Sequence, residues 1–152
     1  MTDDSRNLAR AFWRRSKEFL EAANLVAEAA GDRVSLPAYY LWGHSIELSL
    51  KGFLIGHDIT LRELKSGELG HNLTALWQKA RSLGLGQEIH LYPKEIGTIL
   101  VLSQDYAGKK FEYAEAEEYK LPFIELTKRT ADRLVFLLNP DRKVSPTRAH
   151  GK

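Results

Sequence analysis

The sequence predicts an all-α protein, built as an up-and-down bundle of four long helices and one short helix. Glycine and proline residues divide the 152-residue chain into segments, and nearly every segment repeats its apolar residues with the 3.6-residue period of an amphipathic helix. With 43% hydrophobic and 28% charged residues, the chain has the composition of a globular domain with a sizeable core. These observations predict a single bundle domain over residues 1–140.

The first predicted helix covers residues 5–30 and ends at Gly31, because glycine readily adopts the conformation that follows a helix. At 1.5 Å per residue, it is about 39 Å long. Its core stripe is formed by Phe12, Phe19, Ala23, Val26 and Ala30. Leu8, Trp13 and Leu20 lie off this stripe, and we expect a second copy of the chain to cover them in a homodimer.

The second predicted helix covers residues 37–56 and should occupy the centre of the bundle. Pro37 suits its first turn, a glycine ends it, and the segment between them is apolar on most sides. Thr60 and Glu63 then have the spacing of a capping box. This spacing predicts a short helix over residues 61–65.

Three more helices complete the predicted bundle, over residues 72–83, 93–106 and 122–138. The acidic stretch 111–120 interrupts the helical pattern and is predicted to form a small hairpin or an extended loop. Residues 141–152 are rich in basic side chains and poor in large apolar ones, which predicts a disordered basic tail. We therefore expect that deleting this tail leaves the melting temperature unchanged.

Composition excludes several classes of protein. The absence of cysteine excludes a disulfide scaffold, a cysteine nucleophile and a thiolate metal site. A net charge of +2 gives no overall attraction to nucleic acid or membrane. The longest stretch without a charged side chain, residues 34–46, is too short to span a bilayer, and no secretory signal is visible. The Gly-rich phosphate loops and the nucleophile elbow of common enzymes are also missing. We expect a soluble, cytoplasmic protein.

Three ionisable residues, His44, Glu47 and Lys51, share one face of the second helix because they are three and four positions apart. The structural interpretation is an ion pair between Glu47 and Lys51, with His44 bonded to a backbone group. The functional interpretation is that an otherwise apolar helix carries these groups only where they meet a ligand, a partner protein or another subunit. A metal site is a third interpretation. We expect this face to be at least half-buried.

A second candidate site lies at Gly70, His71 and Asn72, at the start of the predicted helix over residues 72–83. Free backbone N–H groups and the helix dipole favour an anion such as phosphate at this position. Alternatively, His71 or Asn72 caps the helix. If the predicted helices over residues 37–56 and 72–83 are neighbours, His44 and Glu47 lie close to His71. Two imidazoles and a carboxylate are suitable ligands for a divalent cation. The His-Glu-x-x-His motif of zinc proteases is absent, and we predict no resident metal or cofactor.

The segments YLWGHSIELSLKGFL (residues 40–54) and GHNL (residues 70–73) follow a long first helix. This arrangement resembles the HEPN family, the higher-eukaryote and prokaryote nucleotide-binding domains, and especially its small stand-alone bacterial members. The likeness covers residues 5–138. It implies a helical bundle that usually forms a homodimer. Many family members are metal-independent endoribonucleases, and others pair with a nucleotidyltransferase as toxin or antitoxin.

Ribonuclease members of this family carry an arginine followed at a short interval by a histidine. Here Arg62 is farther from His71 than that interval, and the nearest imitation is Lys65 with His71. A lysine lacks the planar fork with which a guanidinium holds phosphate. The leading hypothesis is therefore a HEPN-like non-catalytic module that binds nucleotide, RNA or a partner protein. The alternatives are a divergent metal-independent endoribonuclease that uses His71, and a purely structural antitoxin-like subunit. The candidate ligand-binding residues are His44, Glu47, Lys51, His71 and Asn72.

Overall fold

The computed structural model describes residues 1–107 and 121–142, and these residues form helices and no strand. The predicted all-α class is therefore confirmed for this part of the chain. The helices are α1 (Asp3–Ala30), α2 (Leu36–Gly56), α3 (Leu61–Leu64), α4 (Leu73–Ser82), α5 (Leu85–Glu88), α6 (Pro93–Ala107) and α8 (Ile124–Leu137). The predicted hairpin or loop at 111–120 lies outside the described residues.

Polar side chains fix where four of the helices begin. Thr2, Ser35, Thr60 and Asn72 each accept a hydrogen bond from a backbone N–H of the first turn, of α1, α2, α3 and α4 respectively. The predicted capping box of α3 is present, and the Thr60 N–H bond to Glu63 holds the pKa of that carboxyl below its usual range. This cap consequently persists into moderately acidic solution.

One additional helix and one later helix start distinguish the structure from the prediction, and other helix ends differ by one or two residues. Helix α5 was not predicted, because four residues are too few to show a helical period. Gly84 precedes it with a φ of 95°, a backbone conformation that favours glycine. Helix α8 begins at Ile124 rather than at Pro122, since Phe123 keeps a ψ of 136° and only caps the helix. The carbonyl of Pro122 instead accepts a hydrogen bond from the hydroxyl of Tyr39, 2.8 Å away.

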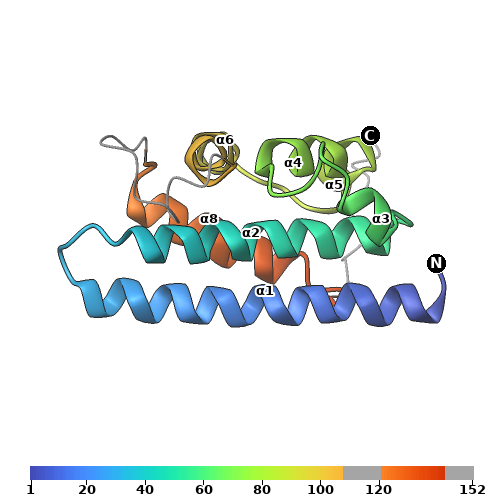
Figure 1. Cartoon of the computed structure of the whole chain (residues 1–152), viewed down its shortest axis with the longest axis horizontal. Coiled ribbons are helices and arrows are strands. Elements are labelled where there is room, and N and C mark those ends of the chain that lie inside the picture. Colours follow the sequence, from blue (N-terminus) through green and yellow to red (C-terminus); the bar gives the residue numbers. More distant parts are fainter. Residues whose placement is uncertain (108–120, 143–152) are drawn as a thin grey trace, which may run out of the picture.

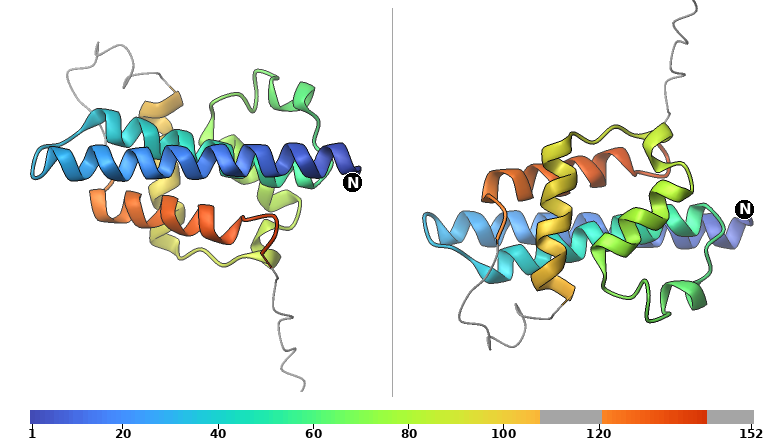
Figure 2. Two further views of the ribbon diagram at one scale, coloured as in Figure 1. Left: turned by 90° about the horizontal axis from the view of Figure 1, so that it is seen from below. Right: turned by 90° about the horizontal axis from the view of Figure 1, so that it is seen from above.

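Helix α2 is the central element of the fold. It lies between α1 on one side and α4 and α6 on the other, while α8 runs beside α1 and α2 (Figure 1). Helix α6 does not continue the up-and-down pattern, because it lies across α2 and α8 (Figure 2). The prediction of an up-and-down bundle is therefore wrong for α6. It holds for α1 and α2, which run in opposite directions, whereas α8 runs in the same direction as α2 (Figure 2).

The core follows the length of α2. Trp42, Ile46, Leu50 and Leu54 are completely buried, and α2 as a whole contacts α1, α4, α6 and α8. Gly52 lets α1 pack closely against α2, since a Cβ atom there would lie 3.3 Å from the backbone oxygen of Ala9. The expected central position of this helix is confirmed.

The three apolar residues of α1 that suggested a dimer surface are packed inside the subunit. Leu20 is buried, and Leu8 and Trp13 pack against the core. The indole N–H of Trp13 donates a hydrogen bond of 2.7 Å to the backbone oxygen of Val135 in α8. The argument for a homodimer from these residues is therefore wrong. Helix α8 covers a face of α1 that the apolar pattern of the sequence did not identify as buried.

The first two residues of the predicted tail contact the bundle. Arg10 of α1 donates two hydrogen bonds to Asp141, and the guanidinium of Arg142 lies 5.6 Å from the ring centroid of Phe136. These contacts attach residues 141 and 142 to the bundle. Residues 143–152 lie outside the described residues. Within the described ranges, no helix combines the length and the apolar character required to cross a membrane.

Candidate functional site

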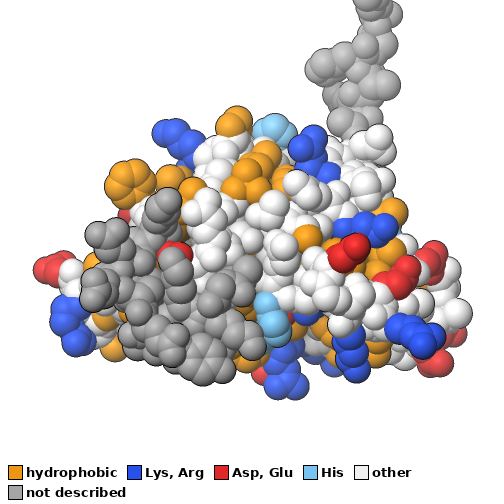
Figure 3. Space-filling model, turned by 45° about the horizontal axis from the view of Figure 1, so that its top comes forward, with side chains coloured by type: hydrophobic (Ala, Val, Ile, Leu, Met, Phe, Trp, Pro, Cys, Tyr) orange, Lys and Arg blue, Asp and Glu red, His pale blue; other side chains and the backbone are white. Residues whose placement is uncertain are grey.

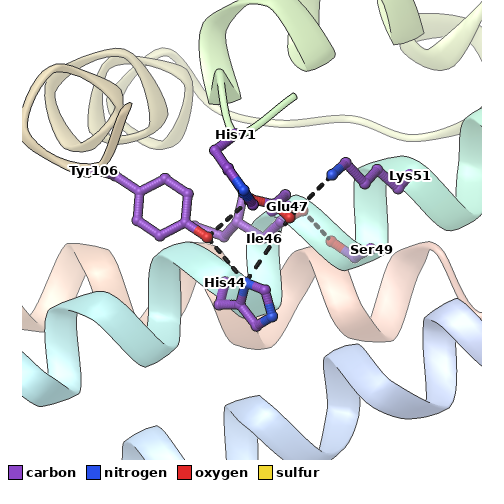
Figure 4. A network of polar contacts seen from close by, with 7 residues as sticks. All are labelled: His44, Ile46, Glu47, Ser49, Lys51, His71 and Tyr106. Atoms are coloured by element: carbon purple, nitrogen blue, oxygen red, sulfur yellow. Dashed lines mark hydrogen bonds and ion pairs between the residues drawn. The ribbon is translucent and has the colours of Figure 1, made fainter. Parts of the chain in front are cut away.

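The carboxylate of Glu47 is the centre of a polar cluster on the side of α2 that faces α4 and α6 (Figure 4). Glu47 is only 1% exposed. Its Oε1 atom accepts hydrogen bonds from His71 Nδ1 at 2.7 Å and from the Tyr106 hydroxyl at 2.8 Å, while Oε2 accepts one from Lys51 Nζ at 3.1 Å. The Tyr106 hydroxyl is also 2.9 Å from Nδ1 of His44. The expected burial of this face is confirmed.

The hydrogen-bond directions in the cluster follow from the chemistry of its atoms. An ionised carboxylate only accepts hydrogen bonds, so His71 donates from Nδ1 and Tyr106 donates its hydroxyl proton to Glu47. Because the Tyr106 hydroxyl donates its hydrogen bond to Glu47, its oxygen acts as the acceptor for the N–H at Nδ1 of His44. Both imidazoles therefore carry a proton on Nδ1. When the His71 ring is neutral, its Nε2 atom carries no proton and has a lone pair that can accept one.

His44 lies in an aromatic environment on the inner side of the cluster. The ring of Phe19 meets it edge-on with a centroid distance of 4.4 Å, and the ring of Tyr40 is stacked parallel to it at 6.1 Å. Helix α1 thus helps to hold the imidazole that donates to Tyr106. The partner of His44 Nδ1 is the hydroxyl of Tyr106, a side chain and not the backbone group that the structural interpretation assumed.

His71 forms the outer side of the cluster. Its side chain is 59% exposed, although its Nδ1 atom is bonded to a buried carboxylate. Lys51 is only 12% exposed and contributes the charge that balances Glu47. The His71 imidazole is therefore exposed to solvent, whereas Glu47 and Lys51 are largely buried beneath it.

The start of α4 is capped from within the protein. The Asn72 side chain accepts the N–H of Ala75, and the N–H of Thr74 donates to the hydroxyl of Ser103 in α6. Two of the backbone donors that an anion would use are thus already occupied. The capping interpretation of Asn72 is confirmed, and the arrangement disfavours a phosphate on this helix terminus.

The structure brings together four of the residues that the sequence singled out, namely His44, Glu47, Lys51 and His71. Lys65, proposed as a companion of His71, caps the end of α3, and the structure shows no polar contact between it and this cluster among the described residues. Tyr106 was missed, because it is distant in sequence and only the crossing of α6 over α2 brings it to Glu47. No local spacing could have revealed it.

Glycine at position 43 makes the approach of Tyr106 to α2 possible. A Cβ atom there would lie 2.7 Å from Cδ2 of the Tyr106 ring, which is inside van der Waals contact. Tyr106 is itself buried. The hydroxyl therefore reaches Glu47 only because residue 43 has no side chain.

We expect Gly43→Ala to lower the free energy of unfolding, although alanine is the better helix former. Overpacking costs about 1–3 kcal/mol, against a gain of about 1 kcal/mol from helix propensity. Gly97→Ala in α6 is the control, since a Cβ atom at Gly97 meets no atom within 4 Å. Chemical denaturation should show opposite signs for the two variants. Equal stabilisation by both would contradict the proposed close packing of Tyr106.

The geometry does not favour a metal ion in the cluster. Nδ1 of both imidazoles is used as a hydrogen-bond donor, and Glu47 already accepts three hydrogen bonds. Within residues 1–107 and 121–142, no three His, Asp or Glu side chains are placed to hold an ion together. The cluster is organised by proton donors around one carboxylate.

A second buried carboxylate, Glu95, anchors the opposite end of α6. It is fully buried, accepts the N–H of Tyr92 at 2.9 Å, and forms an ion pair with Arg133 of α8. Arg133 also lies over the ring of Tyr92, with its guanidinium carbon 4.9 Å from the centroid. This group fixes α6 against α8, and so it supports the position of Tyr106 indirectly.

Charges of both signs are mixed on the molecular surface. On the face shown in Figure 3, both basic and acidic side chains are present, and several Lys and Arg side chains lie along its lower edge. The presence of both signs agrees with the net charge of +2. Any binding of an anionic partner therefore depends on local groups of basic side chains.

The class that the fold and the cluster define is an α-helical domain with an exposed histidine held by a buried glutamate. Comparison with protein-family models, with curated proteins and with solved structures found no match. The function is therefore argued from the site itself.

Proposed function

We propose that the protein is a cytoplasmic HEPN-like domain in which His71 performs general acid–base catalysis on an RNA phosphodiester without a metal ion. One observation carries this proposal. The Nδ1 atom of an exposed imidazole is bonded at 2.7 Å to a carboxylate that is almost completely buried. Such a pair fixes the ring tautomer and its orientation, which is what a catalytic base requires.

The proposed reaction uses the Nε2 atom of His71. That atom removes the proton of a ribose 2′-hydroxyl, and the resulting oxygen attacks the adjacent phosphorus. The bond from phosphorus to the 5′-oxygen breaks, and the departing oxygen takes a proton from a water molecule, while His71 later releases its proton to solvent. The products are a 2′,3′-cyclic phosphate and a 5′-hydroxyl. In this scheme, Glu47 is a positioning residue, because it acts through His71.

The second candidate is the non-catalytic module, which would bind RNA, a nucleotide or a partner protein at the same exposed edge. It is favoured by the composition of the cluster, whose cation is Lys51. A lysine lacks the planar guanidinium fork with which an arginine stabilises a pentavalent phosphate. A homodimer and a nucleotidyltransferase partner are further proposals that depend on the family resemblance.

One experiment separates the candidates. The full-length protein is incubated with mixed RNAs in EDTA, and cleavage and binding are measured for wild type, His71→Ala and Glu47→Gln. If His71 is catalytic, His71→Ala should lower the cleavage rate by about 10²–10⁴-fold while RNA binding persists. His90→Ala, which alters another exposed histidine, should cleave at the wild-type rate.

The outcomes have distinct meanings. Wild-type protein that binds RNA without cleaving it, and loses binding in His71→Ala, supports the module and rejects the catalytic proposal. Cleavage that survives His71→Ala rejects catalysis by this residue. Circular dichroism of each variant shows whether a loss of activity reflects unfolding.

A further inference from the structure

A pocket of about 410 Å³ lies away from the His71 cluster, at the end of the bundle where α1 begins and α8 ends. Its walls come from α1, α2, α5 and the residues that follow α8, and both views in Figure 2 show these segments together. Pockets of this size hold small organic ligands.

Three arginines line the pocket and make its rim positive. Arg6 and Arg10 are one turn apart on α1, and Arg142 approaches from the segment after α8. Arg10 is engaged by Asp141 at 3.0 Å. The guanidinium of Arg6 is 3.7 Å from the almost fully exposed Asp3, and that of Arg142 lies over the ring of Phe136. Arg6 and Arg142 are therefore the groups available to a ligand.

The remaining charged groups of the pocket have partners within the protein. His57 contacts the backbone oxygen of Phe53 through Nδ1 and the carboxylate of Glu88 through Nε2, each at 2.8 Å. The N-terminal ammonium of Met1 lies 3.7 Å from the carboxylate of Asp58. We therefore expect a ligand to meet the arginines.

The inner wall of the pocket is apolar. It is formed by the buried side chains Ala9, Phe53, Ile89 and Leu138, together with Gly52 and Gly56. A Cβ atom at Gly56 would meet no atom within 4 Å, so this wall has unfilled space beside it. An apolar wall below a positive rim matches a ligand with an apolar body and an acidic head.

We propose that this pocket binds a small organic carboxylate with an apolar body. The body packs on the wall around Phe53, and the carboxylate accepts hydrogen bonds from Arg6 and Arg142. A single negative charge suits the site better than the double charge of a phosphate monoester, because Glu88 also lines the pocket and Asp141 is already paired with Arg10. The proposal is independent of the function of His71.

The test compares four probes with the same ten-carbon chain: decanoate, decanol, decyl phosphate and decyltrimethylammonium. Binding to the full-length protein is followed by titration calorimetry and by the melting temperature. Decanoate should bind most tightly and raise the melting temperature. The double variant Arg6→Gln/Arg142→Gln should weaken its binding about tenfold or more. Arg14→Gln, an exposed residue of the same helix outside the pocket, should bind decanoate like wild type.

A second variant tests the location without removing charge. Gly56→Leu places a side chain in the unfilled space and should abolish decanoate binding, whereas Gly97→Leu, which also meets no neighbour at Cβ, should not. Equal binding of all four probes, tighter binding of decyl phosphate, or unchanged binding by Gly56→Leu would overturn the proposal. RNA cleavage or binding should be unaffected by Gly56→Leu, which keeps this test separate from that of His71.

Discussion

Glu47→Ala is expected to lower the free energy of unfolding by about 3–5 kcal/mol, far more than the loss of a surface ion pair. The carboxylate is the common acceptor for His71, Tyr106 and Lys51. Its removal leaves the Lys51 ammonium, which is only 12% exposed, without the partner that offsets its desolvation. Urea denaturation of the two proteins measures the difference.

Two comparisons make this prediction specific. Glu47→Gln keeps one of the two acceptor oxygens in a side chain of the same shape, so it should cost less than Glu47→Ala, although the charge and the second acceptor are lost. Glu18→Ala removes an exposed carboxylate that lies 3.9 Å from Arg15, and should change stability by less than about 1 kcal/mol. A loss from Glu47→Ala as small as that from Glu18→Ala would show that the cluster does not hold α2, α4 and α6 together.

Trp42→Ala is the second large effect that we expect, with a loss of about 3–5 kcal/mol. Trp42 is completely buried in α2, and its indole N–H donates a hydrogen bond of 3.0 Å to the side chain of Asn24 in α1. Truncation leaves a cavity in the contact between α1 and α2, which is the most extensive contact of the fold, and it also removes this hydrogen bond. Thermal and chemical denaturation should both show the change.

The matched comparison uses an exposed aromatic residue. Phe136 of α8 is 68% exposed, and Phe136→Ala should shift stability by no more than about 0.5 kcal/mol. Trp42→Phe should fall between the two, since it keeps most of the apolar volume and loses the bond to Asn24. If Trp42→Ala and Phe136→Ala have similar effects, the assignment of Trp42 to the core is wrong.

The local elements could be predicted well from the sequence because their signals are local. Pro93 begins α6, Gly31 follows α1, and the capping residues of α3 and α4 stand where the chain pattern indicates. The meeting of Glu47 with His71 was also predictable in outline. It required only that the polar face of α2 lie beside the start of α4.

The parts that could not be predicted depend on contacts between distant segments. Tyr106 joins the cluster because α6 crosses α2, and neither helix encodes that crossing by itself. The same limit explains the error about the dimer. An amphipathic stripe defines one buried face, but α1 packs against both α2 and α8, so residues such as Trp13 are also covered.

The hydrogen-bond chain through Tyr106 links an interior histidine to a surface one. His44 donates to Tyr106, Tyr106 donates to Glu47, and Glu47 accepts from His71. The two imidazoles are thus connected through one hydroxyl and one carboxylate, and a change at either ring alters the hydrogen bonds that reach the other. His44→Gln should therefore shift the NMR signals of the His71 ring without touching that residue. A perturbation among the aromatic side chains beside α1 can in this way reach the solvent-facing edge of the molecule.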